Sequence, residues 1–209
     1  MGRGSGPSLY HFCLSSPGGA SDYILRRMED SSWRTLERSY LYRNPWCAFR
    51  VDEVILPDGA TIEYGVLEGS GFASVVPVTD DGKVVLVRQW RQPLGSFTLE
   101  LPSGGLDKGE DPRAAAEREL FEETGFRVGE LEHLVSVHTS TGRTDEVCHL
   151  FRCWAVRDLE GPRPEATEFI QVVELPFEEA LKRISDGAIT DAATVLGLLL
   201  SGRLSQNEA

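Results

Sequence analysis

The stretch GGLDKGEDPRAAAERELFEETGF, residues 104–126, constrains the fold more than any other part of the chain. It reads as a helix with both ends marked in the sequence. Asp111 suits the N-cap, Pro112 suits the first helical position, and Gly125 suits the position just after the last turn. We therefore expect one helix from Pro112 to the residue before Gly125.

The expected helix carries Glu119, Glu122 and Glu123. Positions i, i+3 and i+4 project from one side of a helix, so the three carboxylates share a stripe. Like charges at these spacings cost an isolated helix about 0.2 to 0.5 kcal/mol per pair, and a bound cation would reverse the sign. Mg²⁺ takes oxygen ligands of this kind, together with substrate phosphates and waters. The alternative is a solvated helix face, which is usually charged.

The neighbours of these glutamates on the helix have expected roles of their own. Arg118 can pair with Glu122 one turn on or reach back to Glu110, so we expect it to hold the carboxylates in place. Ala115 and Ala116 lie one turn before the glutamates, and we expect these small side chains to leave room for a bulky anion.

Charge and apolar patterning exclude several classes of protein. The chain of 209 residues has 33 acidic and 21 basic residues, a formal charge of -12, which argues against broad electrostatic binding to nucleic acid or to an anionic membrane. No apolar run approaches the roughly 18 to 20 residues that span a bilayer, and the first residues do not follow the layout of a secretion signal. We expect a cytoplasmic protein without nucleic-acid or membrane partners.

Cysteine and histidine spacing indicates neither a metal site nor a disulfide framework. The four cysteines are scattered without a C-x-x-C pair, and we expect reduced, structural thiols. The four histidines are equally dispersed and are weak candidates as ligands.

The chain divides into three expected segments. Residues 1–30 are rich in Gly, Ser and Pro without periodicity, which predicts a disordered tail, and both Met1 and Met28 remain open as the start of translation. Residues 31–70 read as a small β unit, and residues 71–205 form the main domain.

Turn residues and apolar runs predict the strands and the remaining helices. One hairpin turns at residues 57–59 and a second at residues 80–82, where valine-rich runs indicate strands buried on both faces. Further strands are expected at residues 146–156 and 169–175, followed by helices in PFEEALKRISDG and DAATVLGLLLSGRL. This mixture predicts an α/β or α+β sandwich.

The spacing in residues 104–126 resembles the Nudix box at every defined position. Five residues separate Gly104 from Glu110, and seven more separate Glu110 from Arg118-Glu119-Leu120. One residue then precedes Glu122-Glu123, and one more precedes Gly125-Phe126. The chain is therefore identified as a member of the Nudix hydrolase family. Membership implies an α/β/α sandwich with a mixed sheet and metal-dependent hydrolysis of a nucleoside diphosphate linked to another group.

Three further stretches resemble the ADP-ribose and sugar-nucleotide pyrophosphatase branch of the family. They are RQWRQPLGSFTLELPSGGL, TSTGRTDEVCHLF and EATEFIQVVELPFEEALKRISDGAITDAATVLGLLL. The resemblance implies that Mg²⁺, or Mn²⁺ in its place, is held by the Ser103 carbonyl and by Glu119, Glu122 and Glu123. It also implies a later-loop glutamate as the base near the attacking water, for which Glu168 is the best match and Glu165 the alternative.

The same resemblance implies substrate contacts and a homodimer. Arg91 matches a branch arginine that contacts substrate, and Arg88 is a weaker candidate; the alternative for Arg91 is a salt bridge at a strand end. Trp33 and Tyr64 match aromatic residues that build the base pocket, although such residues on a hairpin are also common at interfaces and in cores. The small β unit of this branch packs across two subunits, which implies a homodimer.

The loop at residues 140–143 departs from the branch pattern. Members that cleave ADP-ribose often carry S-P-G there, whereas this chain has Ser-Thr-Gly-Arg, and we expect Arg143 to be solvated. The expected substrate is ADP-ribose, which would give AMP and ribose 5-phosphate. Other diphosphates (UDP-glucose, GDP-mannose, NADH) remain open, as does a catalytically silent domain that binds ADP-ribose or NAD.

Overall fold

The computed structural model of the chain describes residues 32–159, 161–162 and 169–207. The expected tail, residues 1–30, lies outside the described residues. Contacts divide the described chain into two compact units. Among the described residues, the smaller unit contains 32–39 and 52–64, and the larger unit contains 40–51, 65–159, 161–162 and 169–207.

The first three strands form an antiparallel sheet of their own, in the order β1-β2-β3. The strands are β1 (Arg34–Arg43), β2 (Ala48–Ile55) and β3 (Thr61–Glu68). Alternate residues of β2 are buried, as a strand with one covered face requires. The turn between β2 and β3 is closed by the Gly59 amide, which donates to the Leu56 carbonyl at 2.9 Å. The predicted hairpin is confirmed.

The larger unit is built on a second, mixed sheet of seven strands. Its main path runs β10-β5-β4-β9-β8, with β6 paired to β5 and β7 paired to β4. The strands are β4 (Phe72–Val78), β5 (Lys83–Arg91), β6 (Ser96–Glu100), β7 (Ser103–Gly105), β8 (Phe126–His138), β9 (Val147–Arg157) and β10 (Gln171–Pro176). Strands β4 and β9 run parallel, whereas β5 is antiparallel to β4, β6 and β10.

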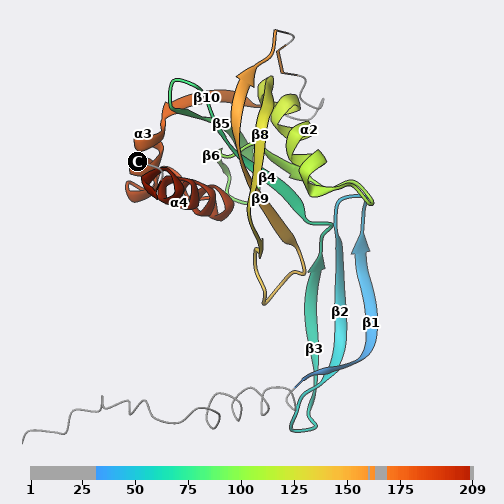
Figure 1. The fold of residues 1–209 in the computed structure, drawn as a ribbon. Helices are drawn as coiled ribbons and strands as arrows, with labels where there is room; N and C mark the ends of the chain where they lie inside the picture. The colour runs from blue at the N-terminus through green and yellow to red at the C-terminus, as the bar shows by residue number, and fades with distance from the viewer. Residues whose placement is uncertain (1–31, 160, 163–168, 208–209) are drawn as a thin grey trace, which may run out of the picture. The chain divides into compact units, whose positions relative to one another are not determined.

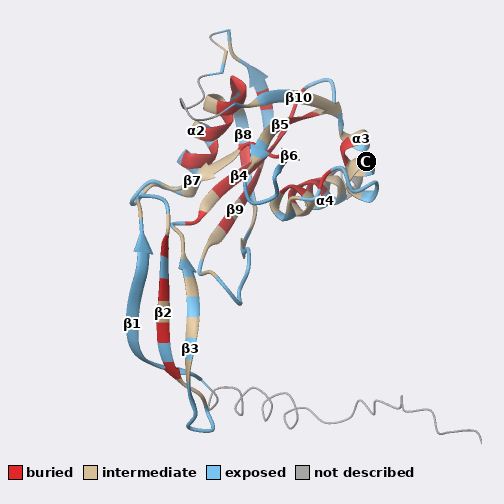
Figure 2. Ribbon diagram, turned by 180° about the vertical axis from the view of Figure 1, so that it is seen from behind, coloured by how far each residue is buried: buried red, intermediate tan, exposed pale blue. Residues whose placement is uncertain are grey.

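Three helices cover the two faces of this sheet (Figure 1). They are α2 (Pro112–Thr124), α3 (Phe177–Ser185) and α4 (Ala192–Asn207). One core cluster joins α2 to β4, β5, β8 and β9, and a second joins α3 and α4 to the opposite face, so the sheet is sandwiched between helices. Figure 2 shows the buried residues concentrated in the central strands and on the sheet-facing sides of the helices. The α/β/α sandwich with its mixed sheet is confirmed.

Sequence reasoning found most of these elements but missed three. The hairpin of β4 and β5, the strands β9 and β10 and all three helices lie where the pattern predicts them. The strands β6, β7 and β8 were not predicted. Strand β7 has only 3 residues, two of them glycine, and β8 carries two register shifts against β9, so neither shows a regular alternation of apolar residues.

The expectation for the two alanines of α2 is wrong. Ala115 and Ala116 are fully buried and belong to the core cluster that contains Leu120 and Phe126. Their small side chains let α2 approach the sheet closely, because a larger residue there would have to displace strand side chains. They leave no room for a ligand.

The described cysteines are free thiols, as expected. They are Cys47, Cys148 and Cys153, of which the last two are buried. Burial raises the pKa of both buried thiols to about 12, so they remain protonated at neutral pH. Their environment favours packing over reactivity.

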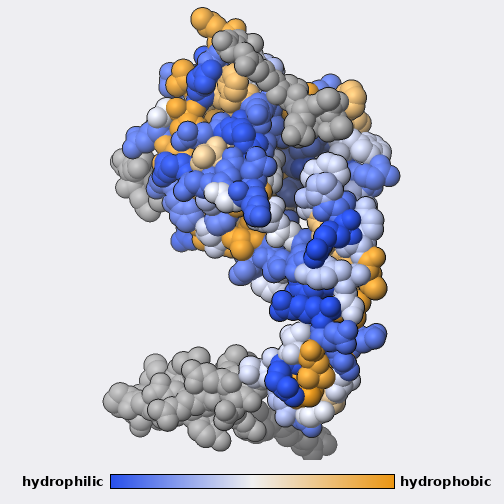
Figure 3. All heavy atoms as spheres, turned by 90° about the vertical axis from the view of Figure 1, so that its right-hand side faces the viewer, coloured by the Kyte–Doolittle hydropathy of each residue, from blue (hydrophilic) through white to orange (hydrophobic). Residues whose placement is uncertain are grey.

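One face of the molecule is largely polar. Figure 3, viewed from the side of α2, shows a largely hydrophilic face on which apolar residues form separate patches. Among the helices of the described residues, none combines the length and the apolar character needed to cross a membrane.

One buried hydroxyl provides a test of the core packing. Ser74 of β4 is 1% exposed, and within the described residues its Oγ has no hydrogen-bond partner. An unsatisfied buried hydroxyl costs about 1 to 3 kcal/mol, and its replacement by an apolar group is often neutral or stabilising. We expect Ser74→Ala to leave the free energy of unfolding unchanged or to raise it by about 1 kcal/mol.

Urea denaturation of purified protein measures this change. Thr79→Val is the control, because the Thr79 hydroxyl donates to Asp81 at 2.6 Å and accepts from the Lys83 amide at 3.2 Å. This variant should lose about 1 kcal/mol. A comparable loss in Ser74→Ala would contradict the assignment of Ser74 as unsatisfied.

Candidate active site

The larger unit contains a cavity of about 770 Å³ that is lined by part of the stretch at residues 104–126 and by residues from distant parts of the chain. Its wall includes Gly104, Gly105, Arg118, Glu119 and Glu122, together with Trp46, Arg91, Glu100, Glu146 and Asp191. Two of the three predicted acidic residues, Glu119 and Glu122, therefore face a space large enough for a small-molecule ligand, whereas Glu123 is buried behind the wall.

Helix α2 places the carboxylates because its two ends are held as the sequence predicts. The Asp111 side chain accepts a hydrogen bond from the Arg113 amide at 2.8 Å, and Pro112 occupies the first turn. At the other end Gly125 has a φ of 71°, and its amide donates to the Phe121 carbonyl at 2.8 Å. An N-cap of this kind contributes about 1 kcal/mol to the helix.

Arg118 gathers the carboxylates at the cavity wall. Its guanidinium donates to both oxygens of Glu110, at 3.0 and 2.9 Å, to Glu119 at 2.6 Å and to Glu122 at 3.2 Å. It also donates to the Gly105 carbonyl at 3.2 Å. The predicted pairing with Glu110 and Glu122 is confirmed. The hydrogen bonds from Arg118 lower the pKa of Glu110, and the same pairing raises the pKa of Arg118.

Strand β7 lies directly against the acidic face of α2. The Ser103 amide donates to Glu123 Oε2 at 2.9 Å, and Glu123 is only 2% exposed. A Cβ added at Gly104 would overlap the carboxylate of Glu119. Two buried glutamates, Glu119 and Glu123, thus meet this strand, and Gly104 is what allows the strand to approach Glu119.

Arg91 takes part in an ion pair and also lines the cavity. It donates to both carboxylate oxygens of Glu100, with Nε lying 2.9 Å from Oε1 and 3.2 Å from Oε2. Burial opposes ionisation of Glu100, but the hydrogen bonds from Arg91 and Thr98 outweigh it and lower its pKa. The fork of donors is therefore already held in one orientation at the cavity wall.

Sequence reasoning missed several residues of the wall, among them Trp46, Glu100, Glu146 and Asp191. Trp46 is 80% exposed although it lines the cavity, and Glu100, Glu146 and Asp191 add carboxylates. Asp191 stands at the N-terminus of α4 and could have been found as a capping residue. Nothing in the local pattern singles out the other three, because they reach the cavity through tertiary contacts alone.

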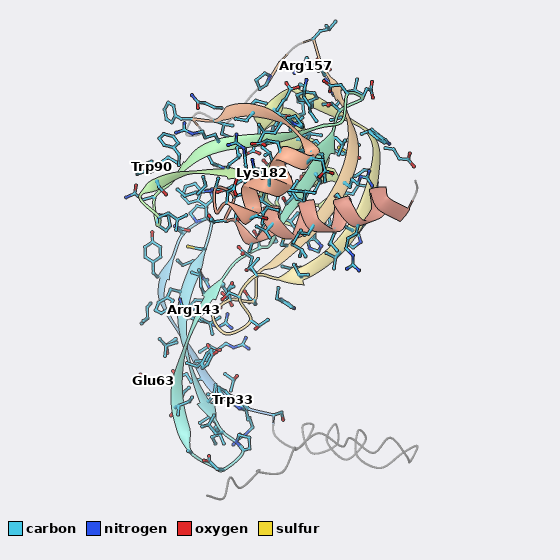
Figure 4. The ribbon with its side chains drawn as sticks, turned by 90° about the vertical axis from the view of Figure 1, so that its left-hand side faces the viewer. Trp33, Glu63, Trp90, Arg143, Arg157 and Lys182 are labelled. Atoms are coloured by element: carbon cyan, nitrogen blue, oxygen red, sulfur yellow. The ribbon has the colours of Figure 1, made fainter. Side chains whose placement is uncertain are left out.

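Other predicted residues lie elsewhere. Trp33, labelled in Figure 4, and Tyr64 belong to the smaller unit, where their ring centroids lie 5.6 Å apart in an edge-to-face arrangement. Arg88 lines a separate cavity of about 240 Å³, where its guanidinium covers the Phe97 ring and donates to Gln171. The expectation that Arg88 contacts substrate in the main cavity is therefore wrong.

Glu165 and Glu168 lie outside the described residues. Arg143 is exposed, as expected.

The chemistry of the wall suits a hard divalent cation. In the part of the chain that the structure describes, no group of three or more His, Cys, Asp or Glu side chains is already arranged to hold a metal ion. Arg118 instead occupies Glu119 and Glu122 with hydrogen bonds. The carboxylates of Glu119, which lies against Gly104, and of Glu122 on the same wall are nevertheless donors of the kind that Mg²⁺ or Mn²⁺ takes.

Comparison with known proteins decides the family. Residues 71–193 match the NUDIX domain, and residues 33–67 match the nucleoside diphosphate sugar hydrolase N-terminal domain. The chain belongs to the Nudix hydrolase family. The two matched regions contain the acidic helix and the three-stranded sheet respectively.

Relatives of this Nudix hydrolase cover most of its length. It is 36% identical to the methanol dehydrogenase activator of Bacillus methanolicus over 79% of this chain and 90% of that protein. It is 33% identical to the ADP-ribose pyrophosphatase of Bacillus subtilis (strain 168) over 82% of this chain and 93% of that one.

A solved structure described as an ADP compounds hydrolase shares the fold of this Nudix hydrolase. The two structures superpose with a TM-score of 0.74 and 19% identity, over 85% of this chain and 96% of that one. Its agreement confirms the architecture independently of sequence.

Gly104 allows a direct test of the acidic wall. We expect Gly104→Ala to displace the Glu119 carboxylate and to lower turnover about 100-fold, since a misplacement of about 1 Å at a catalytic group costs this much. Steady-state kinetics with the best diphosphate substrate measures the loss. Gly105→Ala is the matched control, because a Cβ there meets nothing within 4 Å. Equal activity of the two variants would contradict the close approach.

Proposed function

We propose that this Nudix hydrolase cleaves the diphosphate bond of ADP-ribose or a related nucleoside diphosphate sugar, giving a nucleoside monophosphate and a sugar phosphate. The observation that carries the proposal is the shared cavity of Glu119, Glu122, Arg91 and Trp46. Carboxylates for a metal, a guanidinium for phosphate oxygens and an exposed ring for a base are the groups that such a substrate requires.

The proposed metal ligands are the Ser103 carbonyl and the carboxylates of Glu119, Glu122 and Glu123. The Ser103 amide bond to Glu123 brings this backbone segment and the helix together, which supports a joint role. When bound, Mg²⁺ or Mn²⁺ supplies Lewis-acid stabilisation of the charge that develops on the diphosphate.

Several residues of the chain prepare the site for this reaction. Arg118 holds Glu119 and Glu122 in place through its hydrogen bonds and is itself anchored by Glu110 and the Gly105 carbonyl. Arg91, already oriented by Glu100, is proposed to bind a phosphate oxygen. Glu168, with Glu165 as the alternative, is proposed as the general base that takes a proton from the attacking water.

The base of the nucleotide has two proposed sites. Trp46 lines the same cavity as the acidic helix, and the residue is 80% exposed, which supports stacking on a base. Trp33 and Tyr64 remain proposed base contacts. We also propose a homodimer, because three strands bury little on their own and β1 exposes every one of its residues. A cytoplasmic location remains part of the proposal.

The substrate is tested by product analysis with purified protein, Mg²⁺ or Mn²⁺, and a panel of ADP-ribose, UDP-glucose, GDP-mannose and NADH. We expect preferential cleavage of ADP-ribose to AMP and ribose 5-phosphate. Glu122→Gln and Glu123→Gln should each lower turnover by orders of magnitude, because they remove proposed metal ligands. Circular dichroism checks that both variants are folded.

Each outcome of the panel has a separate meaning. Preference for another sugar nucleotide would move the assignment to that substrate and direct attention to the loop at residues 140–143. Wild-type turnover in either glutamine variant at saturating metal would reject the ligand assignment. Absence of cleavage with both metals, together with binding of ADP-ribose, would favour a sensor domain over an enzyme.

Trp46 gives a second, independent prediction. We expect Trp46→Ala to raise KM for the nucleotide about tenfold or more with little change in kcat, because stacking on a base contributes about 1 to 3 kcal/mol. Trp90→Ala is the control. Trp90, labelled in Figure 4, is an exposed tryptophan of β5 that does not line the cavity. An unchanged KM in Trp46→Ala would leave Trp33 and Tyr64 as the base contacts.

A further inference from the structure

Thr194 of α4 is a buried threonine that links three parts of the larger unit. It is fully buried, and its Oγ1 accepts a hydrogen bond from the Leu101 amide at 2.9 Å. The same hydroxyl donates to Asp191 Oδ2 at 2.7 Å, and the Thr194 amide donates to that oxygen at 2.8 Å. The cap of α4 is therefore joined to the backbone that follows β6.

The backbone held by Thr194 leads directly into the proposed metal-binding segment. Leu101 stands two residues before Ser103, whose hydroxyl donates back to the Leu101 carbonyl at 3.1 Å. Between them, the Pro102 carbonyl accepts from the Val75 amide at 3.1 Å. The segment from Leu101 to Ser103 thus has a hydrogen bond to α4 at its start and one to Glu123 of α2 at its end.

The Leu101 side chain is held by the same helix. Leu101 is 1% exposed, and its Cδ1 lies 2.8 Å from the position that a Cβ on Gly197 would take. Gly197 is one turn beyond Thr194, so α4 contacts Leu101 at two points: Thr194 bonds the Leu101 amide, and Gly197 packs against the Leu101 side chain. A shift of α4 would be transmitted to the segment that enters β7.

Asp191 connects this link to the cavity itself. It lines the wall together with Arg91 and Glu100. The hydrogen bonds to Glu100 are the main cause of the raised pKa of Arg91, and the charge of Asp191 adds a smaller contribution. The carboxylate that accepts from Thr194 therefore also faces the space proposed for the substrate.

We propose that Thr194 is a positioning residue for the Ser103 segment: by fixing the Leu101 amide, it sets where the Ser103 carbonyl meets the glutamates of α2. This inference rests on the proposed function, in which that carbonyl holds a divalent cation. Residues behind the ligands of a metal commonly change its affinity by about 10 to 100-fold. Thr194 touches neither metal nor substrate in this scheme, and acts through the groups that it bonds, the Leu101 amide and the Asp191 carboxylate.

The test compares two threonines with the same local chemistry. Thr194→Val removes the hydroxyl while preserving the shape of the side chain. Thr79→Val is the matched control, because the Thr79 hydroxyl likewise donates to an aspartate and accepts from a backbone amide, in the turn between β4 and β5. Both variants lose similar hydrogen bonds, but only Thr194 is bonded to the backbone segment that contains Ser103.

The measurement is Mn²⁺ binding, followed by electron paramagnetic resonance in the presence of adenosine 5′-(α,β-methylene)diphosphate, which is not hydrolysed at the α,β bond. We expect Thr194→Val to raise the Mn²⁺ concentration for half-saturation about tenfold or more. Thr79→Val should bind Mn²⁺ as the wild type does, and Thr194→Ser, which keeps the hydroxyl, should restore binding. Unfolding in urea is measured for every variant.

The outcomes separate this inference from the proposed function. If Thr194→Val binds Mn²⁺ like the wild type, or if both valine variants weaken binding equally, the positioning role is rejected. If the wild-type protein binds no Mn²⁺ with this diphosphate, the proposed metal site fails, and the inference fails with it. If Thr194→Val does not fold, Thr194→Cys replaces it, because a thiol has a similar size and a weaker hydrogen-bonding group.

Discussion

The hydrogen-bonded charges around Arg118 are the interaction on which the rest of the site depends. Glu119, Glu122 and Glu123 repel one another on α2, and a single guanidinium reaches two of them as well as Glu110 and the Gly105 carbonyl. Because Arg118 is in the middle of the helix and Glu110 precedes it, the pairing also fixes the loop that leads from β7 into α2. The negative charge of the site is thus held in place before any ligand binds.

The backbone of β7 supplies the second constraint on the site. Strand β7 is held by the pairing of Ser103 and Gly104 with β4, by the bond from the Ser103 amide to Glu123, and by the link from Leu101 to α4. Glycine at position 104 lets the strand touch the Glu119 carboxylate. Helices on both faces of the sheet, α2 and α4, are therefore bonded to β7 or to the residues just before it. These bonds explain how a strand of only three residues is held in a defined position.

Local signals account for what sequence reasoning predicted correctly. The caps of α2, the glycine turns of both hairpins and the pairing of Arg118 with Glu110 and Glu122 involve residues close together in the chain, so their spacing is sufficient evidence. The predictions were wrong where the burial of a side chain, and not its local spacing, decides its role. Ala115 and Ala116 share a helix with the glutamates, but they point into the core, and a short glycine strand such as β7 has no periodicity to detect.

The sequence by itself determined the family, the acidic helix with both of its ends, and the residue types that a diphosphate and a divalent cation require. Only the tertiary structure decided which distant residues join them. Trp46, Glu100, Glu146 and Asp191 reach the cavity from four separate segments, whereas Arg88, three residues from Arg91, lines a different one. The physical reason is that the packing of helices on a sheet sets distances between segments, and no local spacing encodes them.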